Sequence, residues 1–173
     1  MEGERVLVRR VRAEDGPELV RVNLASIAAH EPWVIPFRDV ASFQLYLEAC
    51  DGDRKIGFIL RERATHRIAG VVNVSEIVRG AFQSAYLGYF GMQGFQGRGI
   101  MREGLSLIIT HAFRELGLHR LEANIQPGNE RSRALVRRLG FRQEGFSPRY
   151  LMIGGVWRDH ERWAILADEW AVG

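Results

Sequence analysis

The residues best suited to chemistry lie in a glycine-rich turn near the middle of the chain, Gln96 to Gly99, which precedes residues with helical spacing. A helix N-terminus exposes backbone N–H groups without partners inside the helix, and the helix dipole adds partial positive charge, so such a turn binds phosphate. Gly97 and Gly99 would let a phosphate approach the backbone closely. Arg98 and Arg102 would add charge and donors. Because a glycine-rich turn is a weak signal by itself, a plain connection between strand and helix stays open as the alternative.

Two well-known phosphate loops do not fit this turn. A P-loop requires Lys and then Ser or Thr after its last glycine, whereas Gly99 is followed by Ile100 and Met101. A dinucleotide fingerprint requires a third glycine where this chain has Arg102. Glu122 lies at a suitable distance for a ribose ligand, but it falls inside a predicted strand rather than at its end. The turn therefore belongs to neither class.

The segment Gln96-x-x-Gly99-x-Met101 resembles the acyl-CoA pyrophosphate loop of the GCN5-related N-acetyltransferase (GNAT) family, whose pattern is Gln/Arg-x-x-Gly-x-Gly/Ala. Met101 departs from the general pattern, but Met is usual in the branch that acetylates the N-termini of ribosomal proteins. The resemblance is strong from about residue 70 to residue 166. The other matching segments are Ile77 to Phe82, Tyr86 to Tyr89, Pro127 to Ser132, Arg138 to Phe141 and Trp157 to His160.

The resemblance implies an enzyme that transfers an acetyl group from acetyl-CoA to an amine and releases CoA. The backbone of the turn and of the first helical residues would hold the pyrophosphate; these residues are Gln96, Gly97, Arg98, Gly99, Ile100, Met101 and Arg102. The strand edge at Phe90, Gly91 and Met92 would hydrogen-bond the pantetheine arm. A backbone N–H near Phe90 or Gly91 would face the thioester carbonyl. Asn129 would bind the same arm or would only cap the following helix, a position where Asn is favoured.

The leaving thiolate needs a hydrogen-bond donor. Many family members supply a Tyr seven residues after the position of Asn129, where this chain has Val136. Ser132 is the nearest hydroxyl, and it resembles the Ser that the ribosomal-protein branch has at this place. We therefore expect Ser132 to be the partner of the thiolate, with a second capping role as the alternative.

An N-terminal acceptor amine needs less help from a base than a lysine amine would. An α-amino group has a pKa of about 8, so part of it is already neutral near pH 7, and a carboxylate acting through water would suffice. Glu76 is the base that we favour. Glu144, His119 and His160 are further candidates, and positioning of the reactants alone would account for much of the rate.

The pattern of apolar residues predicts the elements that position these groups. Strands are expected over 4–11, 55–61, 67–77, 84–90, 120–126, 141–153 and 156–166, and helices over 12–27, 39–49, 100–116 and 132–139. The strands 55–61, 67–77 and 84–90 should be antiparallel, and 141–166 should form a hairpin around a Gly-Gly turn. This order predicts a single mixed α/β domain over residues 1–173. It agrees with the GNAT fold, a mostly antiparallel, splayed sheet flanked by helices, and the resemblance implies that pantetheine lies in the splay.

Composition argues against several other classes. The chain of 173 residues suits one domain with a sizeable core. Its net charge is +3 and its 24 basic residues, nearly all Arg, are scattered, which favours a solvated surface over a nucleic-acid groove. Cys50 is the only cysteine, so neither a disulfide nor a zinc cluster is expected. No signal peptide or membrane span is visible, and we expect a cytoplasmic protein without a membrane partner.

The acceptor is the part of the function that the residues determine least. Its pocket would lie in early loops around Trp33 and residues 78–83. The resemblance favours the N-terminal amine of a ribosomal protein such as S5. A small amine (polyamine, amino acid or antibiotic) is the second hypothesis. A non-catalytic acyl-CoA-binding module is the third, because Val136 replaces the usual Tyr. The sequence favours neither a monomer nor a dimer.

Overall fold

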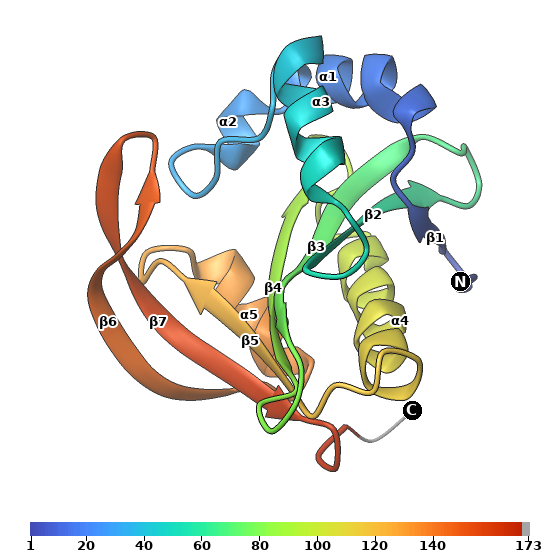
Figure 1. Ribbon diagram of the computed structural model, residues 1–173. Helices are drawn as coiled ribbons and strands as arrows, with labels where there is room; N and C mark the ends of the chain where they lie inside the picture. The colour runs from blue at the N-terminus through green and yellow to red at the C-terminus, as the bar shows by residue number, and fades with distance from the viewer. Residues whose placement is uncertain (171–173) are drawn as a thin grey trace.

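The computed structural model describes residues 1–170, in which seven strands form one sheet in the order β1-β2-β3-β4-β5-β7-β6 (Figure 1). The strands are β1 Val6–Arg10, β2 Lys55–Glu62, β3 Ile68–Val78, β4 Ser84–Gly91, β5 Arg120–Ile125, β6 Arg142–Ile153 and β7 Val156–Leu166. Every neighbouring pair is antiparallel except β4 and β5, which are parallel. The predicted mixed α/β fold with a mostly antiparallel sheet is confirmed.

Helices cover both faces of this sheet. They are the 3₁₀ turn Ala13–Asp15 and the α-helices α1 Gly16–Ala25, α2 Ile27–His30, α3 Val40–Ala49, α4 Ile100–Arg114 and α5 Glu130–Arg138. Tyr46 of α3 reaches Asn73 of β3, whereas His111 of α4 packs against Phe58 of β2. Asn73 and Phe58 point to opposite faces of the sheet, since Phe58 pairs with the residue next to Asn73. α3 and α4 therefore lie on opposite sides of the sheet. Of the helices in residues 1–170, none has the length and apolar character needed to cross a bilayer.

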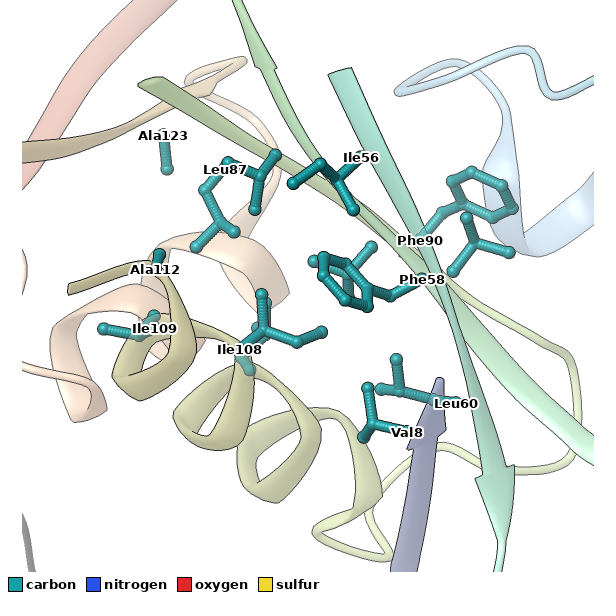
Figure 2. Packing of buried hydrophobic residues seen from close by; sticks show 14 of the residues in the cluster. Val8, Ile56, Phe58, Leu60, Leu87, Phe90, Ile108, Ile109, Ala112 and Ala123 are labelled. Carbon is teal, nitrogen blue, oxygen red and sulfur yellow. The ribbon is translucent and has the colours of Figure 1, made fainter. Parts of the chain in front are cut away.

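The core lies between α4 and the centre of the sheet (Figure 2). The predicted apolar stripe of α4 is present, because Leu105, Ile108, Ile109 and Ala112 are all fully buried. Opposite them are apolar side chains of the strands, including Leu60 of β2. The strand β3 is apolar on both sides because helices cover both faces at its centre.

The first predicted helix, over residues 12–27, is interrupted in the structure. α1 ends at Ala25 and a separate short helix, α2, begins at Ile27. Ser26 lies at the break, and its hydroxyl accepts a hydrogen bond from the Gln93 N–H at 3.0 Å. This long-range contact draws the chain toward the end of β4, and no local pattern could have predicted it.

β4 and β5 separate after a short stretch of pairing. Ser84, Ala85 and Tyr86 pair with Arg120, Leu121 and Glu122, and the pairing then stops. Beyond that point β4 follows β3 to Gly91, whereas β5 follows β7 to Ile125. The expected splay is thus present, and it opens at the ends of β4 and β5 that lie nearest to the N-terminus of α4.

The hairpin of β6 and β7 bends across one side of the splay (Figure 1). A two-residue turn, Gly154-Gly155, joins its strands, and both glycines have positive φ. The register shifts between Ser147 and Leu151, and the Asp159 carboxylate accepts the Arg149 N–H within this bulge at 2.7 Å. The tip of the hairpin contacts the loop between α2 and α3, since a Cβ at Gly154 would lie 2.7 Å from the Ile35 side chain.

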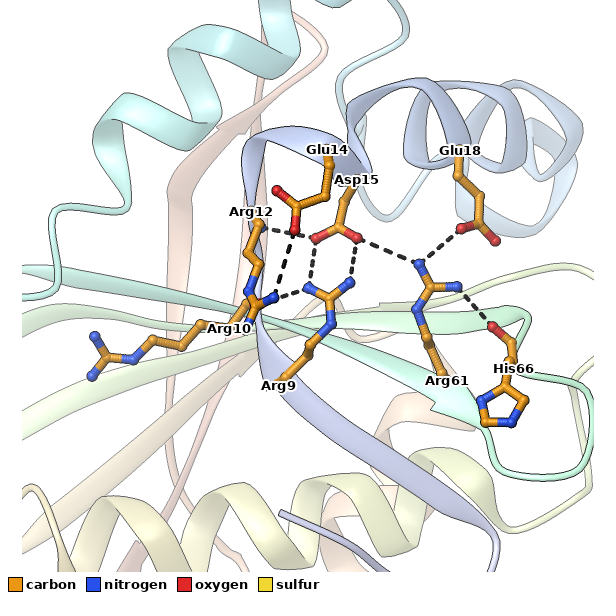
Figure 3. A network of polar contacts seen from close by, with 8 residues as sticks. All are labelled: Arg9, Arg10, Arg12, Glu14, Asp15, Glu18, Arg61 and His66. Carbon is orange, nitrogen blue, oxygen red and sulfur yellow. Dashed lines mark hydrogen bonds and ion pairs between the residues drawn. The ribbon is translucent and has the colours of Figure 1, made fainter.

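A partly buried ionic network, with the buried Asp15 at its centre, joins β1 and β2 to the helical layer (Figure 3). The Asp15 carboxylate, only 2% exposed, accepts two hydrogen bonds from the Arg9 guanidinium and lies 3.4 Å from that of Arg61. Arg61 also donates to Glu18 at 2.8 Å. Burial favours the neutral acid, but the two guanidiniums and the Arg12 N–H outweigh it, so the pKa of Asp15 lies below its ordinary value.

Candidate active site

A cleft lies where β4 and β5 separate. Residues from five parts of the chain line it: the loop after α2, both strands, the N-terminus of α5, and β7. They are Trp33, Val34, Leu87, Gly88, Tyr89, Ala123, Asn124, Ile125, Gln126, Asn129, Ser132 and His160. The Gln126 side chain holds the loop after α2 at the cleft by donating a hydrogen bond to the Trp33 carbonyl at 3.1 Å. Of the two aromatic residues in the early loop, Trp33 lines the cleft, whereas Phe37 packs against Phe43 and Tyr46.

The edge of β4 directs one backbone N–H of its last residues into the splay. The Met92 N–H donates to the Ala69 carbonyl of β3 at 2.9 Å. Because successive residues of a strand direct their N–H groups to opposite edges, the Phe90 N–H also points to β3 and the Gly91 N–H points away from it. Of the three predicted edge residues, Gly91 is therefore the one whose N–H faces the splay. Met92 is bonded to β3 instead, and its side chain is buried.

The imidazole of His30 holds the same peptide segment from α2. Its Nε2 lies 3.0 Å from the Gly91 carbonyl oxygen, which can only accept, so Nε2 carries a proton. The ring also packs edge-on against Phe90 at 5.1 Å. Burial lowers the pKa of His30, so a neutral ring donates this hydrogen bond at pH 7.

The glycine turn has the geometry expected of an anion site. Gly97 and Gly99 have φ of +75° and +77°, and a Cβ at either position would meet no atom within 4 Å. Gly99 is the N-cap of α4 and offers no side chain to the N–H groups of the first turn. Gln96 stabilises the turn itself, since its side-chain oxygen accepts the Gly94 N–H at 2.8 Å.

The two arginines of the turn differ in their surroundings. Arg98 forms an ion pair with Glu62 at 3.0 Å and lies over the Phe95 ring. Arg102 is exposed and has no ion pair within residues 1–170, so its charge is available to a ligand.

The side chains of Ile100 and Met101 pack inside the protein rather than over the turn. Ile100 is 2% exposed, so only its N–H can serve a ligand. Met101 lies against two glycines of the sheet: a Cβ at Gly70 would be 2.5 Å from the Met101 sulfur, and one at Gly91 would be 3.5 Å from its Cγ. A Cβ at Gly70 would clash with the methionine sulfur, so glycine at that position makes room for Met101.

The N-terminus of α5 brings Asn129 and Ser132 to the cleft. The Asn129 side-chain oxygen accepts the Ser132 N–H at 3.1 Å, so Asn129 is a helix cap. The Ser132 hydroxyl makes no hydrogen bond within residues 1–170. Val136 is fully buried in the core, and a Tyr there would have to displace core side chains.

Tyr89 is a cleft residue that sequence reasoning missed. Its hydroxyl donates to the Ser132 carbonyl at 3.4 Å, and burial raises its pKa. The alternation along β4, counted from the core residue Leu87, places Tyr89 on the face covered by α4 and α5 and would have revealed it.

Polar side chains gather on the opposite face of the splay. The hydroxyls of Tyr86 and Tyr150 lie 2.9 Å apart, and that hydrogen bond together with burial raises the pKa of Tyr86 to about 12. The ring of Tyr150 lies 6.2 Å from that of His160, which is 3% exposed. The side-chain oxygen of Asn124 is buried without a protein partner in the described part of the chain. Tyr150 and Asn124 were not predicted, because a bulge and a strand divergence place them here.

The candidate bases are not all brought to the cleft. Glu76 lies at an irregular point of β3 with φ of +49°, and its exposed side chain is 3.4 Å from Arg54. It is not among the residues that line the cleft and its side chain is exposed, so the role of Glu76 as the base stays a prediction. His119 is exposed on the loop before β5. Only His160 among the four candidates lines the cleft.

The site suits the group that the resemblance implies. Three features surround one splay. They are a strand edge without a partner, an uncapped helix N-terminus beside open space, and a buried amide oxygen with no partner in residues 1–170. A phosphopantetheine chain offers amide groups for the strand edge and phosphates for the helix. The residues present therefore fit acyl-CoA.

Comparison with known proteins points the same way. Residues 5–142 match the acetyltransferase (GNAT) domain family. The [ribosomal protein uS5]-alanine N-acetyltransferase of Escherichia coli K12 is 36% identical over 179 residues, covering 98% of this chain and 92% of that protein. Mycobacterium smegmatis RimJ, solved with CoA-disulfide, has a TM-score of 0.86 and 32% identity, covering 95% of this chain and 83% of that one. The ribosomal-protein-S5-alanine acetyltransferase of Vibrio fischeri has a TM-score of 0.86 and 28% identity, covering 99% and 98%.

Proposed function

This chain belongs to the acetyltransferase (GNAT) family, and from that premise we propose that it acetylates the N-terminal α-amino group of a ribosomal protein of the uS5 type, with acetyl-CoA as donor. The observation that carries the proposal is the splay of β4 and β5, which exposes the Gly91 N–H between the glycine turn and the cleft. The choice of acceptor is supported by the Escherichia coli relative, whose similarity extends over 98% of this chain and so includes the acceptor side of the cleft. A ribosomal acceptor would place the reaction in the cytoplasm.

On the donor side, each group of the turn has a separate task. The N–H groups in the first turn of α4 would hold the pyrophosphate, and Arg102 would add charge. When bound, acetyl-CoA supplies an activated thioester carbonyl. The Gly91 N–H would donate to its oxygen and stabilise the negative charge that develops there, and His30 keeps the Gly91 peptide in place. The Ser132 hydroxyl would donate to the departing sulfur.

On the acceptor side, Trp33 and His160 of the β6–β7 hairpin line the cleft, and the Tyr150 ring packs against that of His160. The tip of the hairpin, at Gly154, lies beside Ile35 of the loop between α2 and α3. An extended N-terminus of a protein would approach along this side and present its amine to the splay. Because an α-amino group has a pKa of about 8, it loses its charge at little cost before reaction.

Turnover of acetyl-CoA, followed as free thiol, tests this proposal. The acceptors are a peptide copying the uS5 N-terminus, the same peptide with a blocked α-amino group and a free lysine, and a panel of small amines. We expect turnover only with the first peptide, with the acetyl group found on its α-amino nitrogen by mass spectrometry.

The other results each have a defined meaning. Turnover only with small amines would overturn the ribosomal acceptor and leave the family chemistry standing. Binding of acetyl-CoA without turnover on any amine would favour the non-catalytic module.

A further inference from the structure

We propose that His160 of β7 is the general base that removes the proton of the acceptor amine, an inference that rests on the proposed function. Its ring lines the cleft together with Ser132, from the strand that borders the acceptor side. Neither the family match nor the relatives' names assign this residue a role.

The hydrogen bonding of the ring determines which nitrogen is basic. Nδ1 of His160 lies 2.9 Å from the Arg158 carbonyl oxygen. A carbonyl only accepts, so Nδ1 carries the proton and Nε2 carries the lone pair. Within residues 1–170, Nε2 has no hydrogen-bond partner. Nε2 of His160, a residue that lines the cleft, is therefore available to accept a proton.

Packing holds the ring in this orientation. His160 is 3% exposed, and the Tyr150 ring lies against it at 6.2 Å. Tyr150 is positioned in turn by its hydroxyl contact with Tyr86 and by the bulge at Arg149, which Asp159 fastens. Three consecutive residues thus cooperate: the Arg158 carbonyl sets the tautomer, Asp159 holds the bulge, and His160 faces the cleft.

The surroundings keep the imidazole neutral at pH 7. Burial lowers the pKa of His160, and this effect outweighs the opposing Arg158 carbonyl and Asp159. The other charged or titratable groups on this face are Arg158 and Arg162 of β7, Glu122 of β5, Tyr150 of β6 and Tyr86 of β4. Tyr89 lines the cleft from the opposite face, and β5 and α5 also contribute Asn124 and Ser132, which do not titrate. A neutral imidazole can accept a proton.

The competing carboxylates lack this arrangement. Glu144 is engaged by the guanidiniums of Arg120 and Arg142, which lower its pKa. Glu76 faces solvent beside Arg54. His30 is the other buried imidazole nearby, but its Nε2 already donates to Gly91.

His160 takes the proton while the amine attacks the thioester. The lone pair of the amine nitrogen forms a C–N bond to the acetyl carbon, and the C–S bond breaks with its electron pair leaving on sulfur. The surplus proton of the nitrogen passes to Nε2 of His160, giving an imidazolium that returns its proton to water. No oxidant or further reactant is required.

The pH dependence of kcat/KM on the full chain tests the base directly. As pH falls below the pKa of the amine, about 8, neutral amine is lost and log(kcat/KM) should fall by one unit for each pH unit. At lower pH His160 is protonated as well, and log(kcat/KM) should fall by two units for each pH unit. In His160→Gln the slope should stay at one, and kcat should drop by about 100-fold while the KM for acetyl-CoA is unchanged. The matched control is His111→Gln, a second partly buried imidazole on α4, which should keep the wild-type profile.

Two further measurements keep the proposal decidable if His160→Gln folds poorly. Added imidazole should restore activity to His160→Ala but not to Ser132→Ala. NMR of the wild-type imidazole should show His160 titrating below about 6.5, with a midpoint that moves when the acceptor peptide binds. A wild-type slope of one at all pH values, or a His160→Gln enzyme within about twofold of wild type, would overturn the assignment.

The role of His160 can be tested with whichever amine the chain acetylates, so it can be judged separately from the ribosomal acceptor. If only a small amine is turned over, the same profile can be measured with that amine, and His160 is still tested. If the wild-type chain acetylates no amine at all, both proposals fall together.

Discussion

At the scale of single residues, Ser132 and Tyr89 are the two hydroxyls beside the departing sulfur in the proposed reaction. Val136 occupies the core where many relatives in the family have a tyrosine, so the donor must come from elsewhere. The Ser132 hydroxyl is free of protein partners in residues 1–170, whereas the Tyr89 hydroxyl already donates to a carbonyl. This difference makes Ser132 the better donor.

Removal of the Ser132 hydroxyl should therefore slow the chemical step. We expect Ser132→Ala to lower kcat by about tenfold or more, because one preorganised donor is lost, and to change the KM for acetyl-CoA little. The Asn129 cap uses the Ser132 N–H, so the helix should survive. Tyr89→Phe is the matched variant. Steady-state kinetics that show full kcat in Ser132→Ala and a loss in Tyr89→Phe would transfer the role to Tyr89.

At the scale of elements, α4 begins in a backbone conformation that only glycine adopts easily. Gly99→Ala should cost about 1 kcal/mol from the positive φ. It should also raise the KM for acetyl-CoA, since the added methyl group stands in the open space where the pyrophosphate would lie. Gly117→Ala is the matched control, because Gly117 follows the other end of α4 with φ of +63° and open space around it. If both variants lose the same stability and have the same KM for acetyl-CoA, the turn does not bind the cofactor.

The junction between the strands β1 and β2 and the helical layer depends on Asp15. Asp15→Asn leaves Arg9 without its buried counter-charge and leaves Arg61 with Glu18 alone, and we expect a loss of about 3 kcal/mol in the free energy of unfolding. The pKa of Asp15 is lowered in the folded state, so its contribution is complete above the ordinary value of about 3.9 and is lost as pH falls through the folded pKa. Denaturant titrations at several pH values measure both effects. Asp39→Asn should be nearly neutral, because Asn also caps a helix.

At the scale of the whole molecule, one sheet connects every part of residues 6–166. We therefore expect the chain to unfold in a single cooperative transition, with equal calorimetric and van't Hoff enthalpies. CoA at 100 times its Kd should add about 2.7 kcal/mol to the stability of the folded state. Two separate transitions, of which CoA shifts only one, would show that the sheet is divided into independent units.

The sequence by itself determined the strands and the central helix α4, and it indicated where the donor side of the proposed site lies. Alternation and helical spacing depend on neighbouring residues, so all seven strands and the apolar stripe of α4 were predictable. The segment Gln96 to Met101 is equally local, and it carried the family resemblance.

Only the tertiary structure decided the acceptor side. Tyr86, Tyr150 and His160 meet because a bulge shifts the register of β6 and because β4 parts from β5, and neither event leaves a local signal. Glu76 is a similar case, because irregular pairing of β3 and a positive φ interrupt the regular alternation at that residue. Local patterns report which residues form a strand, whereas long-range pairing sets which of their side chains share a cleft.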